Sequence, residues 1–220
     1  MFINYRVDRE LLQRQVPFEL ELYEGEAYVS LVAFTLVRMR PRLGGFPAEL
    51  LFRPIATHEF LNVRTYVRNA GEPGIFFLAE WLSNRISVQL GPRIFGLPYQ
   101  FGHLRYEHPG EGDGFRGKVE ARHGRLEYQG SGAQGSLAAC EPGSLSEFML
   151  ERYTAFTQRR KRRRLFRIWH EPWPQTAVSC QVGDTSLIAS SGPWWKSAQL
   201  VSANFSPGVD VLMGRPHRIA

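Results

Sequence analysis

The chain lacks most of the patterns on which common enzyme classes depend. It has only two cysteines, Cys140 and Cys180, without the close spacing of metal ligands, and its six histidines include no close pair typical of zinc motifs. It contains no phosphate-binding loop, no Gly-x-Gly-x-x-Gly and no nucleophile elbow. We therefore expect neither a metal nor a cofactor, and the spacing of residues indicates no Ser-His-Asp triad.

Long hydrophobic runs are also absent. No apolar stretch approaches the roughly 20 residues that span a bilayer, and the first residues have no signal-peptide layout. Two lone cysteines without a secretory signal are typical of free thiols in a reducing cytoplasm, so we expect a cytoplasmic protein. The 220 residues contain no internal repeat and no long linker, which predicts a single domain over residues 1–220.

Lysine is scarce as well. The three lysines are Lys118, Lys161 and Lys196. Only Lys196, which follows two tryptophans, has apolar neighbours that could lower the pKa of its amine. A Schiff-base lysine at that position is an alternative that we do not favour.

Positive charge is concentrated in one place. The net charge is +6, and an unbroken run of six cations covers Arg159, Arg160, Lys161, Arg162, Arg163 and Arg164, so the rest of the chain is formally neutral. We interpret this run as a solvated helix end and loop, because charge runs are usually surface features. The alternative is a surface for nucleic acid or for an anionic membrane. The sequence does not decide whether the protein forms a homo-oligomer.

Turn signals and hydrophobic alternation predict a chain rich in strands. A capping box that begins at Ser144 predicts a helix to about Gln158. The expected strands cover residues 26–38, 58–68, 75–81, 99–107, 115–120, 125–129, 165–170, 176–182 and 197–205. Shorter helices are expected at 9–14, capped by Asp8, and at 83–91, with a loop over 41–54 and a glycine-rich turn over 109–117.

The strand that begins at His58 has two unlike faces. One is mostly apolar and is expected to pack in the core. The other carries His58, Phe60, Asn62, Arg64 and Tyr66, a mixture of donors and aromatic rings that suits a pocket for an anionic ligand. The alternative is a row of side chains facing solvent.

Several side chains elsewhere could complete such a pocket. Glu80 interrupts an apolar strand that a short turn places beside Arg64, so we expect both in one enclosed polar site. A buried carboxylate needs a partner or has a raised pKa, and the alternative is a structural pair with an arginine such as Arg64, Arg85 or Arg93. His170 could act as an acid, a base or a donor, with Trp173 as a pocket wall, although a lone histidine is more often structural.

Several segments resemble known families. The run Arg93-Ile-Phe-Gly-Leu-Pro-Tyr-Gln100 is similar to the catalytic segment of acetoacetate decarboxylase and its relatives. The strings Asn62-Val-Arg-Thr-Tyr-Val67 and His170-Glu-Pro-Trp-Pro174, with weaker matches at 74–80 and 150–154, resemble the uncharacterised YqjF-like family, placed in the same fold. The likeness covers most of residues 3–182.

The resemblance implies an α+β fold in which a curved, mainly antiparallel sheet closes into a cone-like barrel with a few helices and a pocket inside. In the decarboxylase, two lysines follow the proline, and the first forms a Schiff base. Here Tyr99 and Gln100 stand there, so we expect no such activity. His103 shares a strand face with Tyr99. The leading hypothesis is binding of a small anionic organic ligand; the alternative is acid–base chemistry on a carbonyl substrate through Glu80, Tyr99 or His170.

Overall fold

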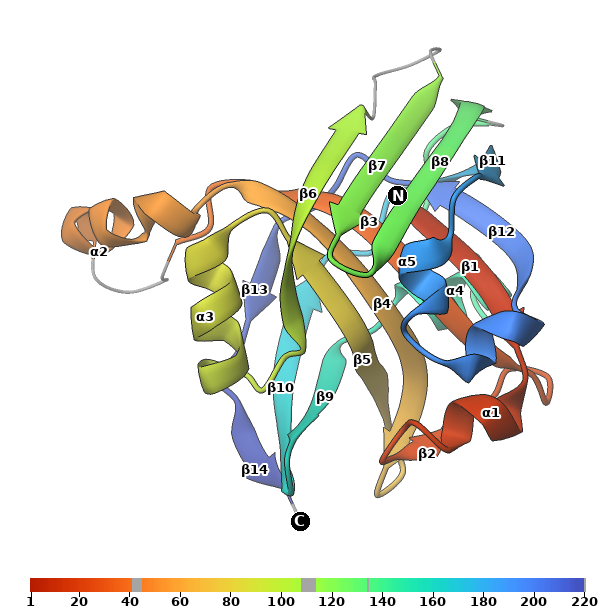
Figure 1. Cartoon of the computed structure of the whole chain (residues 1–220), viewed down its shortest axis with the longest axis horizontal. Helices are drawn as coiled ribbons and strands as arrows, with labels where there is room; N and C mark the ends of the chain where they lie inside the picture. Colours follow the sequence, from red (N-terminus) through yellow and green to blue (C-terminus); the bar gives the residue numbers. More distant parts are fainter. Residues whose placement is uncertain (41–44, 108–113, 134, 220) are drawn as a thin grey trace.

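A closed nine-strand mixed barrel with few helices forms the centre of the computed structural model (Figure 1). The structure describes residues 1–40, 45–107, 114–133 and 135–219. The α+β barrel class implied by the resemblance is confirmed, including its mainly antiparallel pairing.

The barrel runs in the order β5-β6-β7-β8-β11-β12-β1-β3-β4, and the pairing of β4 with β5 closes it. Only β5 and β6 pair in parallel within this ring. The strands are β1 (Phe2–Val7), β3 (Ala27–Leu36), β4 (His58–Asn69), β5 (Glu72–Leu82), β6 (Tyr99–Glu107), β7 (Phe115–Ala121), β8 (Gly124–Ala133), β11 (Thr176–Val182) and β12 (Gln199–Phe205).

A smaller group of strands extends the sheet beyond the barrel. The strand β9 (Thr154–Arg159) pairs in parallel with the start of β5, and β10 (Arg162–His170) pairs antiparallel with β9. The outer edge of β10 carries β13 (Val211–Met213) and β14 (His217–Ile219), while β2 (Glu19–Leu20) pairs with β4. Along β5, therefore, a parallel partner lies at each end: β9 at residues 75–76 and β6 at residues 80–82.

The helices are short and lie around the barrel (Figure 1). Asp8 caps the first by accepting hydrogen bonds from two backbone amides, as predicted, and Ser144 caps α4. The helices are α1 (Arg9–Gln13), α2 (Gly45–Phe52), α3 (Arg85–Ile94), α4 (Leu145–Leu150) and α5 (Ser186–Ala189), with 3-10 turns η1 (Arg53–Ile55) and η2 (Pro193–Ser197).

Apolar side chains fill the barrel. All nine strands contribute to one buried cluster, with alternate residues such as Ile3, Leu31, Leu61, Trp81 and Leu126 pointing into it. This arrangement confirms that the apolar face of β4 packs in the core. The polar residues of β4 point the other way, so they do not line the inside of the barrel.

A second buried cluster covers the outside of β1, β3, β4 and β5. It includes Phe2, Tyr28, Tyr66, Phe77 and Met149, so α4 and neighbouring segments cover this part of the sheet. The outer face of β4 is consequently enclosed between the barrel and a covering layer, and it is not a solvent-facing row.

Two expectations for residues 144–164 are wrong. The helix at Ser144 ends at Leu150, and residues 154–159 form β9. Threonine and phenylalanine favour a strand there, and the edge of β5 supplies the pairing partner. The basic run is therefore no helix end; it is the tip and second strand of the β9–β10 hairpin, with Arg160 in the left-handed conformation at the turn.

Smaller differences lie elsewhere. Part of the predicted 41–54 loop is α2, and the strands β1, β13 and β14 were not predicted. The cap of α3 is Asn84, one residue after the start predicted at Ser83, and the helix continues past Gly91 to Ile94. Much of the predicted glycine-rich turn, residues 109–113, lies outside the described residues, and its last residues, 115–117, belong to β7.

Within the described part of the chain, no helix is both long enough and apolar enough to cross a membrane.

Candidate functional site in the polar layer outside the barrel

Three candidate residues come together on adjacent strands. In the sheet register, Asn62 of β4 lies opposite Glu80 of β5, and Glu80 is the partner of Tyr99 at the start of β6. A bulge in β5 near Leu78 shifts the register, so that Arg64 lies opposite Phe77. Such bulges re-aim side chains. Continued without the bulge, the pairing from the turn would place Glu80 opposite Leu61; with it, Glu80 lies opposite Asn62 on the polar face.

Glu80 is a buried carboxyl group without a charged partner. Glu80 is only 2% exposed, and its Oε2 atom has no hydrogen-bond partner. Burial raises the pKa of Glu80 well above its ordinary value of 4.5. Among the described residues no arginine pairs with Glu80, so the structural ion pair considered from the sequence is not formed. A protonated Glu80 would be a hydrogen-bond donor.

Arg64 lies in the same layer, two residues from Asn62. Its Nη2 donates to the carbonyl oxygen of Met149 in α4 at 2.8 Å, and its guanidinium lies 5.7 Å from the ring centre of Phe2. The Nε of Arg64 and the Oδ1 of Asn62 are buried without partners. Since buried polar atoms in folded proteins nearly always have partners, three orphaned atoms on two strands mark this layer as unusual.

Tyr66 has a structural role that the sequence did not reveal. It is fully buried, and its hydroxyl contacts Ser30 and donates to Met149 at 3.1 Å. Ser30 in turn donates to Asn4 at 2.6 Å, and Asn4 donates to Asn204 at 3.2 Å. This row of hydrogen bonds crosses β4, β3, β1 and β12. Ser30 and Asn4 were missed, and a polar residue inside an otherwise apolar strand was the signal.

Tyr99 is held tightly between α3 and the sheet. A Cβ atom built on Gly91 would lie 2.1 Å from the Tyr99 ring, so only glycine allows this approach. The ring also packs edge-on against Phe60 at 5.9 Å. Burial, and then the neighbouring Glu80, raise the pKa of Tyr99 well above its ordinary value of 10. The phenol is therefore protonated and can donate one hydrogen bond.

His170 and Trp173 form a separate cluster at the end of β10. The Nδ1 of His170 lies 2.8 Å from the Glu171 carbonyl oxygen, and its ring packs against Tyr153 at 4.7 Å and Trp173 at 4.9 Å. Trp173 reaches the layer through Phe2, at 5.6 Å. The structure thus places His170 among structural contacts rather than beside Glu80.

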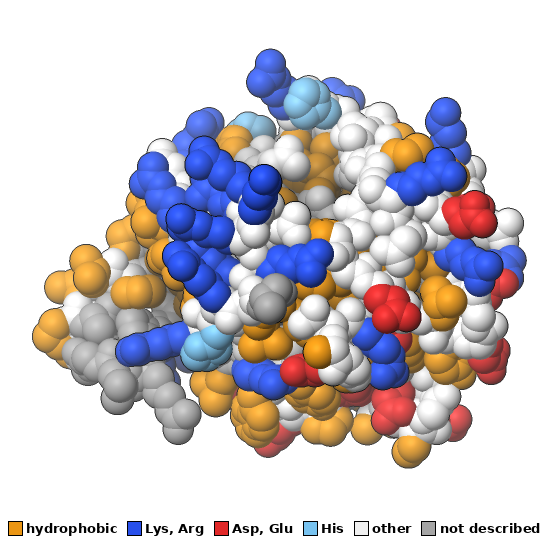
Figure 2. All heavy atoms as spheres, turned by 90° about the horizontal axis from the view of Figure 1, so that it is seen from below, with side chains coloured by type: hydrophobic (Ala, Val, Ile, Leu, Met, Phe, Trp, Pro, Cys, Tyr) orange, Lys and Arg blue, Asp and Glu red, His pale blue; other side chains and the backbone are white. Residues whose placement is uncertain are grey.

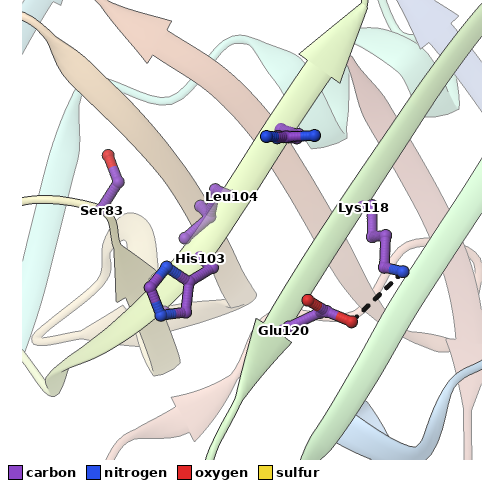
Figure 3. Close-up of a pocket in the computed structure, with 7 residues that line it drawn as sticks. Ser83, His103, Leu104, Lys118 and Glu120 are labelled. Atoms are coloured by element: carbon purple, nitrogen blue, oxygen red, sulfur yellow. Dashed lines mark ion pairs between the residues drawn. The ribbon is translucent and has the colours of Figure 1, made fainter.

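His103 lies outside this layer. Four residues along a strand span about 13 Å, and Phe101 separates His103 from Tyr99. His103 lines an open hollow of about 460 Å³ over β6 and β7 (Figure 3). Lys118 in that hollow is already paired with Glu120 and Glu127, each at 3.2 Å. Its charge is therefore largely neutralised.

A second cavity lies closer to the polar layer. It measures about 250 Å³ and is lined by Phe77, Leu78, Gly96 and Pro98, with Thr157 and Gln158 from β9. It opens where β5 passes from its partner β9 to its partner β6. Neither this cavity nor the hollow at His103 is lined by Arg64 or Glu80.

Comparison of the sequence with known protein families identifies the family over almost the whole chain. The family model DUF2071, described as an uncharacterized conserved protein, matches residues 1–210. The chain belongs to this family. It is 31% identical over 198 residues to the uncharacterized protein YqjF of Bacillus subtilis (strain 168), a match that covers 87% of this chain and 78% of that protein.

Solved structures show the same fold at low sequence identity. The enduracididine biosynthesis enzyme MppR, with HEPES buffer bound, has a TM-score of 0.68 at 15% identity, covering 100% of this chain and 84% of that chain. Acetoacetate decarboxylase from Legionella pneumophila has a TM-score of 0.66 at 16% identity, covering 100% and 83%. An acetoacetate decarboxylase-like enzyme from Sphingomonas wittichii RW1 has a TM-score of 0.67 at 14% identity, covering 99% and 89%. This DUF2071 chain therefore has the acetoacetate decarboxylase-like fold.

Proposed function

We propose that this DUF2071 protein binds a small organic carboxylate in the polar layer outside the barrel, with Asn62, Arg64, Glu80 and Tyr99 as its contacts. The observation that carries the proposal is the set of buried atoms without partners: Asn62 Oδ1, Arg64 Nε and Glu80 Oε2. Ligand oxygens would give these groups the partners that buried polar atoms require.

The chemistry of these groups favours an acceptor-rich ligand. Arg64 is a cation, and a protonated Glu80 and a protonated Tyr99 each offer one O–H donor. The amide of Asn62 supplies a donor when it is turned by 180°, an orientation that heavy-atom positions do not distinguish. Several donors around one cation suit the oxygens of a carboxylate and a neighbouring carbonyl. The structural neighbour MppR is also known in complex with pyruvate, which is consistent with such a ligand in this fold.

Entry of the ligand requires a local opening. The 250 Å³ cavity borders Phe77 and Pro98, which lie three residues from Glu80 and one residue from Tyr99 along the chain. We propose that a ligand enters from this side.

Calorimetric titration with pyruvate and acetoacetate tests the proposal. Wild-type protein is expected to bind one of them, and Arg64→Ala to weaken binding by about 2 kcal/mol, the scale of a charge-assisted hydrogen bond. Arg85→Ala is the matched control, because Arg85 packs on Phe101 outside the layer. No binding by the wild type, or equal losses in both variants, would contradict the proposal.

A Schiff base is not part of this function. Tyr99 cannot form one, and Lys196 is exposed on η2. Borohydride reduction in the presence of pyruvate or acetoacetate is therefore expected to leave the protein mass unchanged. An adduct at any of the three lysines, found by peptide mass spectrometry, would show that the chemistry is covalent after all.

The unpaired Glu80 also favours a second candidate function, proton transfer to a bound carbonyl compound. A carboxyl group with a raised pKa is suited to general acid chemistry near neutral pH. The variant Glu80→Gln distinguishes the two functions, because glutamine keeps a donor but cannot transfer a proton. Retained pyruvate binding, with no solvent-deuterium exchange into pyruvate by either wild type or variant, would support a binding protein. Retained binding with loss of solvent-deuterium exchange into pyruvate, measured by NMR against wild type, would support the enzyme.

A further inference from the structure

The strongest surface feature is the β9–β10 hairpin together with α2 and α3. Six consecutive cations occupy residues 159–164, and among the described residues none of them pairs with a carboxylate within 4.0 Å. Arg159, Arg160, Lys161 and Arg162 are exposed. Figure 2 shows Lys and Arg gathered on one side of this face and Asp and Glu mainly on the other.

Two helices at the left of Figure 1, α2 and α3, expose apolar side chains. Phe46 and Leu51 of α2 are each 76% exposed. On α3, Ile86, Leu90 and Ile94 follow one another at four-residue intervals and are all exposed, so they form a stripe along the helix. Exposure of apolar side chains to water is unfavourable, and a contiguous exposed apolar surface marks an interaction site.

Direct contacts join the helices and the hairpin into one surface. Arg159 donates to the Pro92 carbonyl at 3.0 Å and Arg164 to the Ile94 carbonyl at 2.7 Å, both at the end of α3. Asn84, which caps α3, donates to Pro54 of η1 at 2.7 Å, and η1 follows α2. In Figure 1, α2 and α3 lie at the left of the molecule, and β14 and the hairpin tip lie at its bottom.

We propose that this surface docks on an anionic lipid membrane, with the hairpin cations near the phosphate groups and the apolar side chains of α2 and α3 inserted at the interface. Peripheral membrane binding takes two signals, and a basic patch beside an apolar face provides both. The docking is independent of the ligand proposed for the polar layer.

Two other occupants fit the surface less well. Nucleic acid would engage the cations, but it would leave Phe46, Leu51 and the α3 stripe in water, and its readers are typically polar or aromatic. A second copy of this chain would cover the apolar side chains. In a two-fold dimer, however, the two basic hairpins would be brought towards each other with no carboxylate between them, which is unfavourable.

Sedimentation with vesicles tests the proposal. The full chain is expected to bind phosphatidylcholine vesicles that contain phosphatidylserine and not to bind vesicles of phosphatidylcholine alone. Binding to the phosphatidylserine vesicles is expected to weaken as the salt concentration rises. The triple variant Arg160→Ser, Lys161→Ser, Arg162→Ser is expected to bind at least about tenfold more weakly. A control with Arg9→Ser, Arg14→Ser and Arg122→Ser removes the same charge from exposed positions elsewhere and is expected to bind as the wild type does.

A second variant separates the occupants. Phe46→Ser with Leu51→Ser is expected to weaken vesicle binding while the remaining binding keeps its salt dependence, because the cations are intact. Absence of binding to phosphatidylserine vesicles, or equal binding by the hairpin variant, overturns the proposal. Binding of duplex DNA that the hairpin variant loses and the α2 variant retains, without vesicle binding, would assign the surface to nucleic acid. A dimer in sedimentation equilibrium that the α2 variant dissociates would assign it to self-association.

Discussion

Two buried glutamates in this protein lie in opposite chemical settings. Glu21, next to β2, is 8% exposed and accepts from Arg68 and from Arg152, each at 2.7 Å. Glu80, near the end of β5, is 2% exposed, has no arginine partner among the described residues and leaves Oε2 without a hydrogen bond. The first is a charged group whose burial is compensated within the protein; the second has no charged partner among the described residues.

The difference shows what a buried carboxyl group does in each place. Arg152 stacks at 4.2 Å over Phe148 and holds Glu21 with a nearly buried guanidinium, so this pair fastens α4 to the rest of the fold. Nothing of this kind holds Glu80. Uncompensated polar groups persist where function requires them, and so the contrast favours Glu80 over Glu21 as a functional residue.

The largest effect is expected at the paired glutamate. Glu21→Ala leaves the guanidinium of Arg152 buried without its partner, which should lower the free energy of unfolding by about 3 kcal/mol. Urea denaturation measures it. Arg68→Ala is the control, because its side chain is 47% exposed and such pairs contribute about 1 kcal/mol or less. Equal losses in the two variants would show that the burial of Arg152 does not matter.

An intermediate effect is expected at Glu80, with a distinctive pH dependence. Because its pKa is raised in the folded state, folded protein binds the proton more tightly than unfolded protein does. This contribution to stability is complete below the unfolded pKa, near 4.5, and is lost as pH rises towards the folded pKa. Glu80→Gln has no group that titrates there, so its free energy of unfolding does not fall in this way. The stability of the variant relative to the wild type should therefore increase as pH rises.

Urea midpoints of wild type and Glu80→Gln, measured from acid to mildly alkaline pH, check this prediction. Parallel curves would mean that Glu80 is charged in the folded protein and that it has a partner after all. Glu21→Gln serves as a comparison, since it should be less stable than the wild type at neutral pH.

The smallest effect is expected for charges that remain in water. Arg160→Ser, Lys161→Ser and Arg162→Ser together should change stability by less than about 0.5 kcal/mol, because the tip side chains are exposed. Arg163→Ser should cost about 1 kcal/mol, since Arg163 donates to the Pro17 carbonyl at 2.8 Å and lies over Phe18. Thermal melts compare them, and a large loss in the tip variant would place those cations in structural contacts.

Much of the fold was predictable from local pattern. Strands at 99–107 and 176–182 were predicted with the bounds that the structure has, because alternation and turn signals act within a few residues. Prediction failed where distant partners decide. Residues 154–159 continue the sequence after α4, yet they form a strand because the edge of β5 is available to pair with them.

For the candidate site, too, some features could be predicted from the sequence and others depend on the tertiary structure. Sequence alone identified Glu80 as a buried carboxyl group in an apolar strand, Asn62 and Arg64 as members of one strand face, and Tyr99 and Gln100 in place of the two lysines. Strand alternation and composition suffice for the first two statements, and the third rests on the resemblance to acetoacetate decarboxylase. The tertiary structure decided that this face lies outside the barrel under α4 and that a bulge places Glu80 opposite Asn62. It also decided that Tyr99 joins them while His103 and His170 do not. Register and barrel closure depend on pairing between segments far apart in the chain, and no local pattern contains that information.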